Sequence, residues 1–236
     1  MSSFRTRLRQ TAQGSRGRQM GFAAQAASKP TPQLLVIAIV EEASSDGALI
    51  ESGAGALIST SLDALEAVVA AADDVPVGVR VDATTVATAE QAREAGVDFI
   101  AFNDAETEAE ALLEPEPGRV LLIESDVDDE RLKSFSGMRL DAIITAPPVH
   151  PLMVRDQLAL RRIADRAGAP LIAPSAEAPG TATLHAWRNA GVLAVLVPGD
   201  EALVQATVKA AAAVPAPTPI RDEERGIALV PSAGDG

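Results

Sequence analysis

The chain has 236 residues, 47% of them hydrophobic, with a formal net charge of −13 and no cysteine. This length and apolar content suit one large domain with a substantial core. The lack of cysteine excludes disulfides, thiolate nucleophiles, zinc–thiolate sites and iron–sulfur clusters, and it favours a cytoplasmic location. No apolar run reaches the roughly 18 to 20 residues of a membrane span, so none is expected. The negative charge argues against nucleic acid as a partner, because nucleic acids select clustered Lys and Arg.

Residues 1–30 form a basic N-terminal segment. Its arginines are Arg5, Arg7, Arg9, Arg16 and Arg18. The spacing of Phe4 and Leu8 predicts an amphipathic helix that packs its apolar side against the rest of the protein. The arginines leave a second interpretation open, in which this segment docks onto an anionic partner or builds a homo-oligomer.

Between residues 31 and 214, short β-rich apolar runs alternate with helical stretches, the pattern of βα units around a parallel sheet. The expected strands are Leu34–Val40, Ala54–Ser59, Val77–Val81, Val97–Phe102, Val120–Glu124, Ala142–Thr145, Leu171–Pro174 and Leu193–Val197. Helical segments between them include Ser61–Ala72, Thr85–Ala95, Val154–Ala167, Thr181–Asn189 and Glu201–Ala213. Eight such units predict the α/β class and a single (β/α)8 TIM barrel.

Glycines recur at the same place in several of these units. Gly96, Gly168 and Gly191 each follow a helical stretch and precede a strand, where a left-handed helix cap is needed. The rival architecture, an open doubly wound sheet, typically has a Gly-rich nucleotide turn after an early strand. Neither GxGxxG nor GxxxxGK[ST] occurs in the sequence, so the barrel is favoured.

After Val214 the composition changes to prolines and alternating charges, which predicts a disordered C-terminal tail over residues 215–236. Within this tail, Ile227–Val230 is a short apolar piece that can dock on the barrel or on a partner. The expected organisation is therefore a basic segment, a barrel and a tail.

The repeated Ala-Gly-Val phrases at Ala95–Val97 and Ala190–Val192 resemble those of the phosphate-binding barrels of tryptophan, histidine, pyrimidine and thiamin biosynthesis. The similarity covers about residues 30 to 214 and carries the fold better than an activity. It implies an active site where the strands end and a phosphate site in the turns after the seventh and eighth strands. Here those turns contain Glu177 and Asp200, whose carboxylates would occupy or repel an anion site.

Polar residues follow most of the predicted strands. They are Glu41, Asp82, Asn103, Asp104, Glu124, Thr145, Ser175 and Asp200. Asp82, Asp104 and Glu124 predict an oxygen-rich metal site for Mg²⁺ or Mn²⁺, the cofactor being otherwise unknown. Acidic residues just after strands are also typical helix N-caps, so helix capping alone is the competing interpretation.

Alternation along the third strand sets Val77, Val79 and Val81 on one face and Arg80 and Asp82 on the other. An arginine that points into a barrel needs a carboxylate partner, because burying an unpaired charge is costly. We therefore expect Arg80 to pair with Glu124 of the fifth strand.

The functional interpretation assigns roles to the strand-end residues. Arg80, Asn103 and Ser175 would bind a small anionic metabolite, and Asp82 and Glu124 would act as acid–base groups. His150 joins these catalytic candidates, because its proline-rich loop follows the sixth strand.

Three function classes stay open. The first is a lyase or isomerase with a divalent metal at the barrel mouth. The second is a catalytically silent binding or regulatory barrel, and the third is a scaffold or assembly protein. A Schiff-base mechanism is excluded, because Lys29, Lys133 and Lys209 all fall outside the predicted strands.

Overall fold

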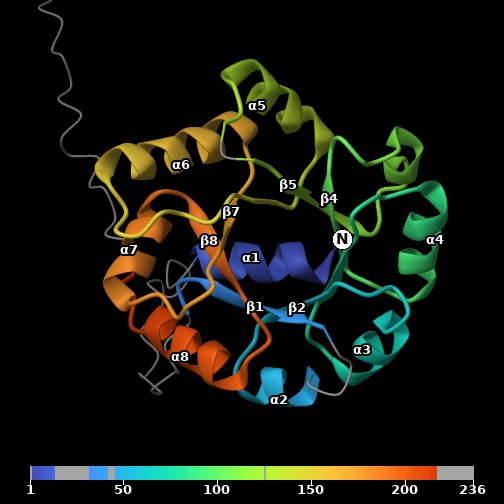
Figure 1. Cartoon of the computed structure of the whole chain (residues 1–236), viewed down its shortest axis with the longest axis horizontal. Helices are drawn as coiled ribbons and strands as arrows, with labels where there is room; N and C mark the ends of the chain where they lie inside the picture. The colour runs from blue at the N-terminus through green and yellow to red at the C-terminus, as the bar shows by residue number, and fades with distance from the viewer. Residues whose placement is uncertain (1, 14–31, 42–45, 125, 217–236) are drawn as a thin grey trace, which may run out of the picture.

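A computed structural model describes residues 2–13, 32–41, 46–124 and 126–216. Its eight strands are parallel and close into a barrel in sequential order, with β1 paired to β8. Helices surround this barrel as an outer ring (Figure 1). The predicted α/β class and (β/α)8 fold are therefore confirmed.

The strands match the predicted segments, with ends that differ by at most two residues. They are β1 Leu35–Val40, β2 Ala56–Ser59, β3 Val77–Arg80, β4 Phe99–Asn103, β5 Gly118–Leu122, β6 Ala142–Ile144, β7 Leu171–Pro174 and β8 Val192–Val197. The sequence identifies them because each is a short apolar run whose side chains are almost all shielded from water on both faces of the sheet.

The α-helices are α1 Ser3–Gln13, α2 Asp46–Glu51, α3 Leu65–Ala71, α4 Val86–Glu94, α5 Asp129–Phe135, α6 Val154–Ala167, α7 Thr181–Asn189 and α8 Glu201–Ala212. Short 3-10 helices occupy Ala109–Leu112 and Ser136–Met138. The predicted glycine caps are confirmed, since Gly96, Gly168 and Gly191 have φ angles of 80°, 66° and 101°. None of the described helices is long and apolar enough to cross a membrane.

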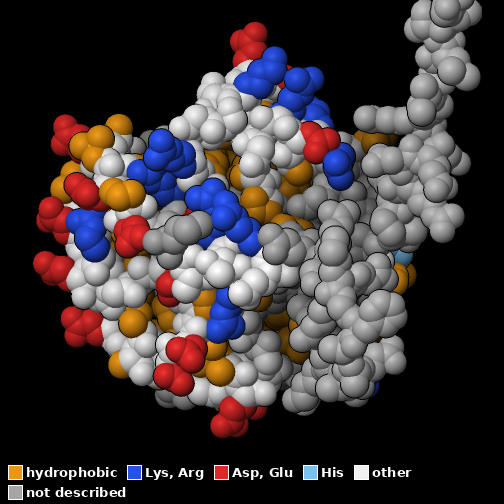
Figure 2. Space-filling model, turned by 180° about the vertical axis from the view of Figure 1, so that it is seen from behind, with side chains coloured by type: hydrophobic (Ala, Val, Ile, Leu, Met, Phe, Trp, Pro, Cys, Tyr) orange, Lys and Arg blue, Asp and Glu red, His pale blue; other side chains and the backbone are white. Residues whose placement is uncertain are grey.

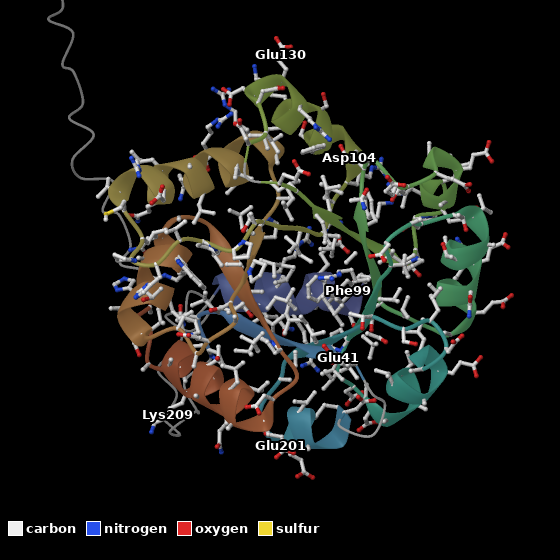
Figure 3. The ribbon with its side chains drawn as sticks, in the orientation of Figure 1. Glu41, Phe99, Asp104, Glu130, Glu201 and Lys209 are labelled. Carbon is white, nitrogen blue, oxygen red and sulfur yellow. The ribbon has the colours of Figure 1, made fainter. Side chains whose placement is uncertain are left out.

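Helix α1 closes the N-terminal end of the barrel. Phe4 is fully buried, and its ring stacks on that of Phe99 with the centroids 4.1 Å apart. Leu8 is 2% exposed and belongs to the same interior cluster. In Figure 1 the helix lies across the middle of the ring of strands, and Figure 3 shows Phe99 inside that ring. The expected packing of Phe4 and Leu8 is therefore confirmed.

The barrel interior leaves room for this plug. At the end of the barrel that α1 closes, the even-numbered strands contribute Ala56, Phe99, Ala142 and Ala194 to the interior. Three alanines beside one phenylalanine make a space that the ring of Phe4 fills. Gly78 on β3 adds to this space, because a Cβ atom there would lie 2.2 Å from the Phe99 ring.

Polar contacts hold α1 against the loops that enter the strands. Arg7 donates hydrogen bonds to the carbonyl oxygens of Asp74 at 2.7 Å and Gly55 at 3.3 Å, and Arg5 forms an ion pair with Asp141 at 3.5 Å. Figure 2 shows Lys and Arg side chains gathered over the middle of this face, where α1 lies. At least these two arginines of the basic segment therefore bind their own barrel. Arg16 and Arg18 lie outside the described residues, as does most of the predicted tail.

Asp141 is 6% exposed and lies beneath α1, where one of its carboxylate oxygens lacks a hydrogen-bond partner. Burial raises the pKa of this carboxyl, and the nearby Arg5 only partly opposes the effect. The folded state therefore binds the Asp141 proton more tightly than the unfolded chain does. The stability that this tighter proton binding contributes is fully present below the pKa of Asp141 in the unfolded chain. It is lost as the pH rises through the higher pKa of Asp141 in the folded state.

We accordingly expect Asp141→Asn to gain stability relative to the unsubstituted protein as the pH rises above about 4. Urea unfolding of both proteins at a series of pH values measures the difference in free energy of unfolding. The attraction of the ionised carboxylate to Arg5 needs no separate correction, because it is already included in the folded pKa of Asp141, which burial still raises. A difference that stays flat, or that grows against the variant with rising pH, would contradict the raised pKa.

Candidate functional site

A pocket at the mouth of the barrel lies where β4 and β5 end and α5 begins. Its volume is about 550 Å³. The lining residues are Asn103, Asp104, Ala105, Glu106, Leu122, Ile123, Glu124, Asp126, Val127, Arg131 and Phe135. The apolar members come from the end of β5, from the loops after β4 and β5 and from α5, and the exposed charged members form the rim. We call this feature the β4–β5 pocket.

Asn103 shapes the rim of this pocket. Its side-chain oxygen accepts hydrogen bonds from the backbone N–H groups of Ala105 at 3.0 Å and Glu106 at 2.7 Å. Its amide nitrogen donates to the carbonyl oxygen of Asp82 at 3.2 Å. These bonds tie the loop after β4 to the loop after β3. Asn103 therefore holds the loops after β3 and β4 together at the edge of the pocket.

Asp104 pairs with Arg131, which the sequence interpretation did not single out. The Nη2 of Arg131 lies 2.7 Å from the carboxylate of Asp104, and this bond raises the pKa of the guanidinium. Asp128 caps α5 by accepting a hydrogen bond from the backbone N–H of Arg131 at 2.8 Å. Asp128 therefore stabilises the start of α5, and the first turn of this helix places Arg131 at the rim of the pocket. The Asp128-Asp129-Glu130 run is the sequence signal for that helix start.

The rest of the rim is acidic. Glu106, Glu124 and Asp126 are exposed at the pocket and form no ion pair with any described residue. The pocket thus has four carboxylates and one guanidinium, and that guanidinium is already paired. A positively charged group is the complement of such a rim.

The predicted metal cradle is not assembled. Within the described part of the chain, no three His, Asp or Glu side chains are grouped so that they could hold a metal ion. Asp104 is turned to Arg131, and Asp82 does not line the pocket that contains Glu124. The three carboxylates therefore do not fit a shared Mg²⁺ or Mn²⁺ ion. The reason is that they lie at the ends of three different strands without converging.

The predicted pair of Arg80 with Glu124 is wrong. Arg80 does lie on the inward face of β3, two residues after Gly78, but it is exposed at the open mouth and makes no ion pair with a described residue. The pairing of β3 with β4 sets Arg80 beside Ala101, and Ala101 is beside Val120. Because barrel strands are tilted, the residue of β5 level with Arg80 is Leu122, and Glu124 lies one layer higher.

Ser175 and His150 are also separate from the pocket. The hydroxyl of Ser175 donates a hydrogen bond to the carbonyl oxygen of Glu177 at 2.7 Å, within the turn after β7. His150 is exposed in the loop before α6 and is not among the pocket residues. Of the predicted site residues, the structure gathers Asn103, Asp104 and Glu124 at one pocket. Arg80, Asp82, His150 and Ser175 lie outside its lining.

In the turn after β8, a side chain of the turn itself occupies the start of the next helix. Asp200 caps α8, and its carboxylate accepts a hydrogen bond from the backbone N–H of Leu203 at 2.7 Å. A phosphate at this helix start would need the same N–H groups and would meet a negative charge. The expected occupation of this site by a carboxylate is confirmed for Asp200.

No protein-family model and no curated protein matches the sequence. Solved structures do match the fold. A thiamine phosphate pyrophosphorylase from Pyrococcus furiosus is 14% identical, with a TM-score of 0.58 over 75% of this chain and 95% of that one. A tryptophan synthase from M. tuberculosis is also 14% identical, with a TM-score of 0.60 over 76% of this chain and 93% of that one. The chain therefore shares the (β/α)8 barrel of these biosynthetic enzymes, and at this identity the likeness concerns the fold alone.

Proposed function

We propose that the chain is a small-molecule-binding barrel whose β4–β5 pocket takes an amine-bearing ligand. The observation that carries the proposal is the charge of the pocket, four carboxylates around one guanidinium that is already paired. An ammonium or guanidinium group can donate hydrogen bonds to Glu124 and Asp126, which have no ion-pair partner among the described residues. The apolar part of the ligand then lies against Leu122, Val127 and Phe135.

The same charges disfavour a lyase or isomerase that acts on an anionic metabolite. An anion in this pocket would face uncompensated carboxylates, and Asp200 already occupies the helix start that could bind a phosphate. Among the described residues, neither Asp82 nor the exposed His150 lines the pocket that contains Glu124, so the predicted acid–base groups do not share this pocket. A binding or regulatory barrel is therefore the interpretation that these residues support best.

Calorimetric titration with agmatine, which has an amine and a guanidinium, tests the charge of the ligand class. We expect saturable binding that salt weakens, and about tenfold weaker binding after combined Glu124→Gln and Asp126→Asn substitution. Glu130→Gln is the matched control, because Glu130 is an exposed carboxylate of α5 that points away from the barrel (Figure 3). Binding of succinate or glycerol phosphate in place of agmatine, or agmatine binding that the double variant keeps, would overturn the proposal.

A further inference from the structure

Exposed apolar side chains gather at the start of α6. Val149, Met153, Val154 and Leu158 are 70%, 53%, 72% and 64% exposed, and they account for all but one of the exposed large hydrophobic residues in the described part of the chain. Soluble proteins rarely leave such a group uncovered without a binding partner. We call these four residues the α6 patch. Val149 also borders a smaller hollow of about 180 Å³ at the barrel mouth, so the patch continues toward the mouth.

The chain that follows α8 leaves the barrel beside the C-terminal end of α7, the helix next to α6. Arg188, near the end of α7, donates a hydrogen bond to the carbonyl oxygen of Pro215. Helix α7 lies between α6 and α8 in the outer ring (Figure 1). Residues after Ala216 therefore start one helix away from α6, near the ends of α6 and α7 that are remote from the mouth.

The apolar piece Ile227–Val230 can reach the α6 patch from this starting point. Residues 217–226 span up to roughly 33 Å when extended. Leu158 is nine residues from the end of α6 at Ala167, which corresponds to about 14 Å along the helix. The length of chain before Ile227 is therefore more than sufficient.

The spacing of the apolar side chains in the tail segment also matches the spacing of those on α6. Ile227 and Leu229 of an extended segment lie on one side, about 6.6 Å apart. Val154 and Leu158 of α6 are one turn apart, which is about 6 Å along the helix. Arg161 on α6 is 56% exposed and forms an ion pair with Asp165 of the same helix at 2.9 Å. The segment places Asp222, Glu223 and Glu224, flanked by Arg221 and Arg225, ahead of its apolar piece. A segment that runs toward the mouth would thus bring its carboxylates to Arg161 and its apolar side chains to the patch.

We propose that residues 222–230 of the same chain dock along α6 and cover the α6 patch. A second copy of α6 fits less well. If two copies met across a two-fold axis at Leu158, Arg155 of each would face Arg161 of the other, and like charges repel. The docked segment would end beside the barrel mouth, next to the smaller hollow. This proposal does not depend on the ligand of the β4–β5 pocket.

Disulfide trapping in the full chain tests the docking, because the natural sequence contains no cysteine. One variant carries Leu158→Cys and Leu229→Cys, and its matched control carries Gln205→Cys and Leu229→Cys. Leu158 and Gln205 are each the fifth residue of their helix, both are exposed, and α6 and α8 flank α7. With dilute protein and oxidised glutathione, we expect the intramolecular disulfide to form about tenfold faster in the first variant.

Adding Ile227→Asp to the first variant is expected to slow its disulfide formation to the rate of the control. Equal rates in the two cysteine pairs would overturn the proposal. Disulfide-linked dimers as the main product would also overturn it, since they would assign the patch to the segment of another chain. Both cysteines on the barrel replace exposed side chains, so neither substitution removes core contacts.

Discussion

Replacing Phe4 by alanine is expected to lower the free energy of unfolding by about 3 to 5 kcal/mol. Phe4 is fully buried inside the end of the barrel and stacks on Phe99 at 4.1 Å. The alanines around this ring cannot move inward to fill the space, because they belong to the closed sheet. The substitution therefore loses both the buried ring and the stacking contact, and it leaves a cavity.

Urea denaturation of the full chain, followed by circular dichroism, measures this loss. Gln10→Ala is the control, since Gln10 is an exposed residue of the same helix, and we expect it to change stability by less than about 0.5 kcal/mol. If Phe4→Ala were as mild as the control, α1 would not be an integral part of the barrel core. The basic segment would then be available for the external docking that the sequence alone leaves open.

The sequence predicts the barrel well because its evidence is local and repeated. Each strand is an apolar run, and the glycines at positions 96, 168 and 191 mark the return from helix to strand. The short helices α2 and α5 are harder to anticipate than α3, which is also only seven residues long but lies in a stretch rich in alanine, a strong helix former. Their formation depends on packing against the barrel.

The candidate site is less predictable for a geometric reason. The sequence places Asp82, Asp104 and Glu124 correctly at strand ends, but the stagger between tilted strands decides which of them meet. Arg80 illustrates the point, since it lies one layer below its predicted partner Glu124. The true partner of Asp104 is Arg131 of α5, a contact between segments 27 residues apart. No local pattern indicates such a contact.

The second large effect is expected from Gly78→Ala, which should lower the free energy of unfolding by about 1 to 3 kcal/mol. A Cβ atom at Gly78 would lie 2.2 Å from the Phe99 ring, far inside van der Waals contact. That ring cannot turn aside freely, because Phe4 stacks on it from α1. Gly47→Ala is the matched control, since a Cβ atom at Gly47 meets nothing within 4 Å.

A double-mutant cycle distinguishes this clash from a general intolerance of β3. Phe99→Leu removes part of the ring and should cost stability in the natural sequence, because it leaves a cavity. In the Gly78→Ala protein the same change relieves the overlap, so we expect its cost to fall by about 1 kcal/mol or more. Additive effects would mean that the added methyl group is accommodated without Phe99. A favourable coupling would indicate that Gly78 on β3 and the ring of Phe99 on β4 are fitted to each other. Because Phe4 stacks on that same ring, this fit prepares the surface against which α1 packs as part of the barrel core.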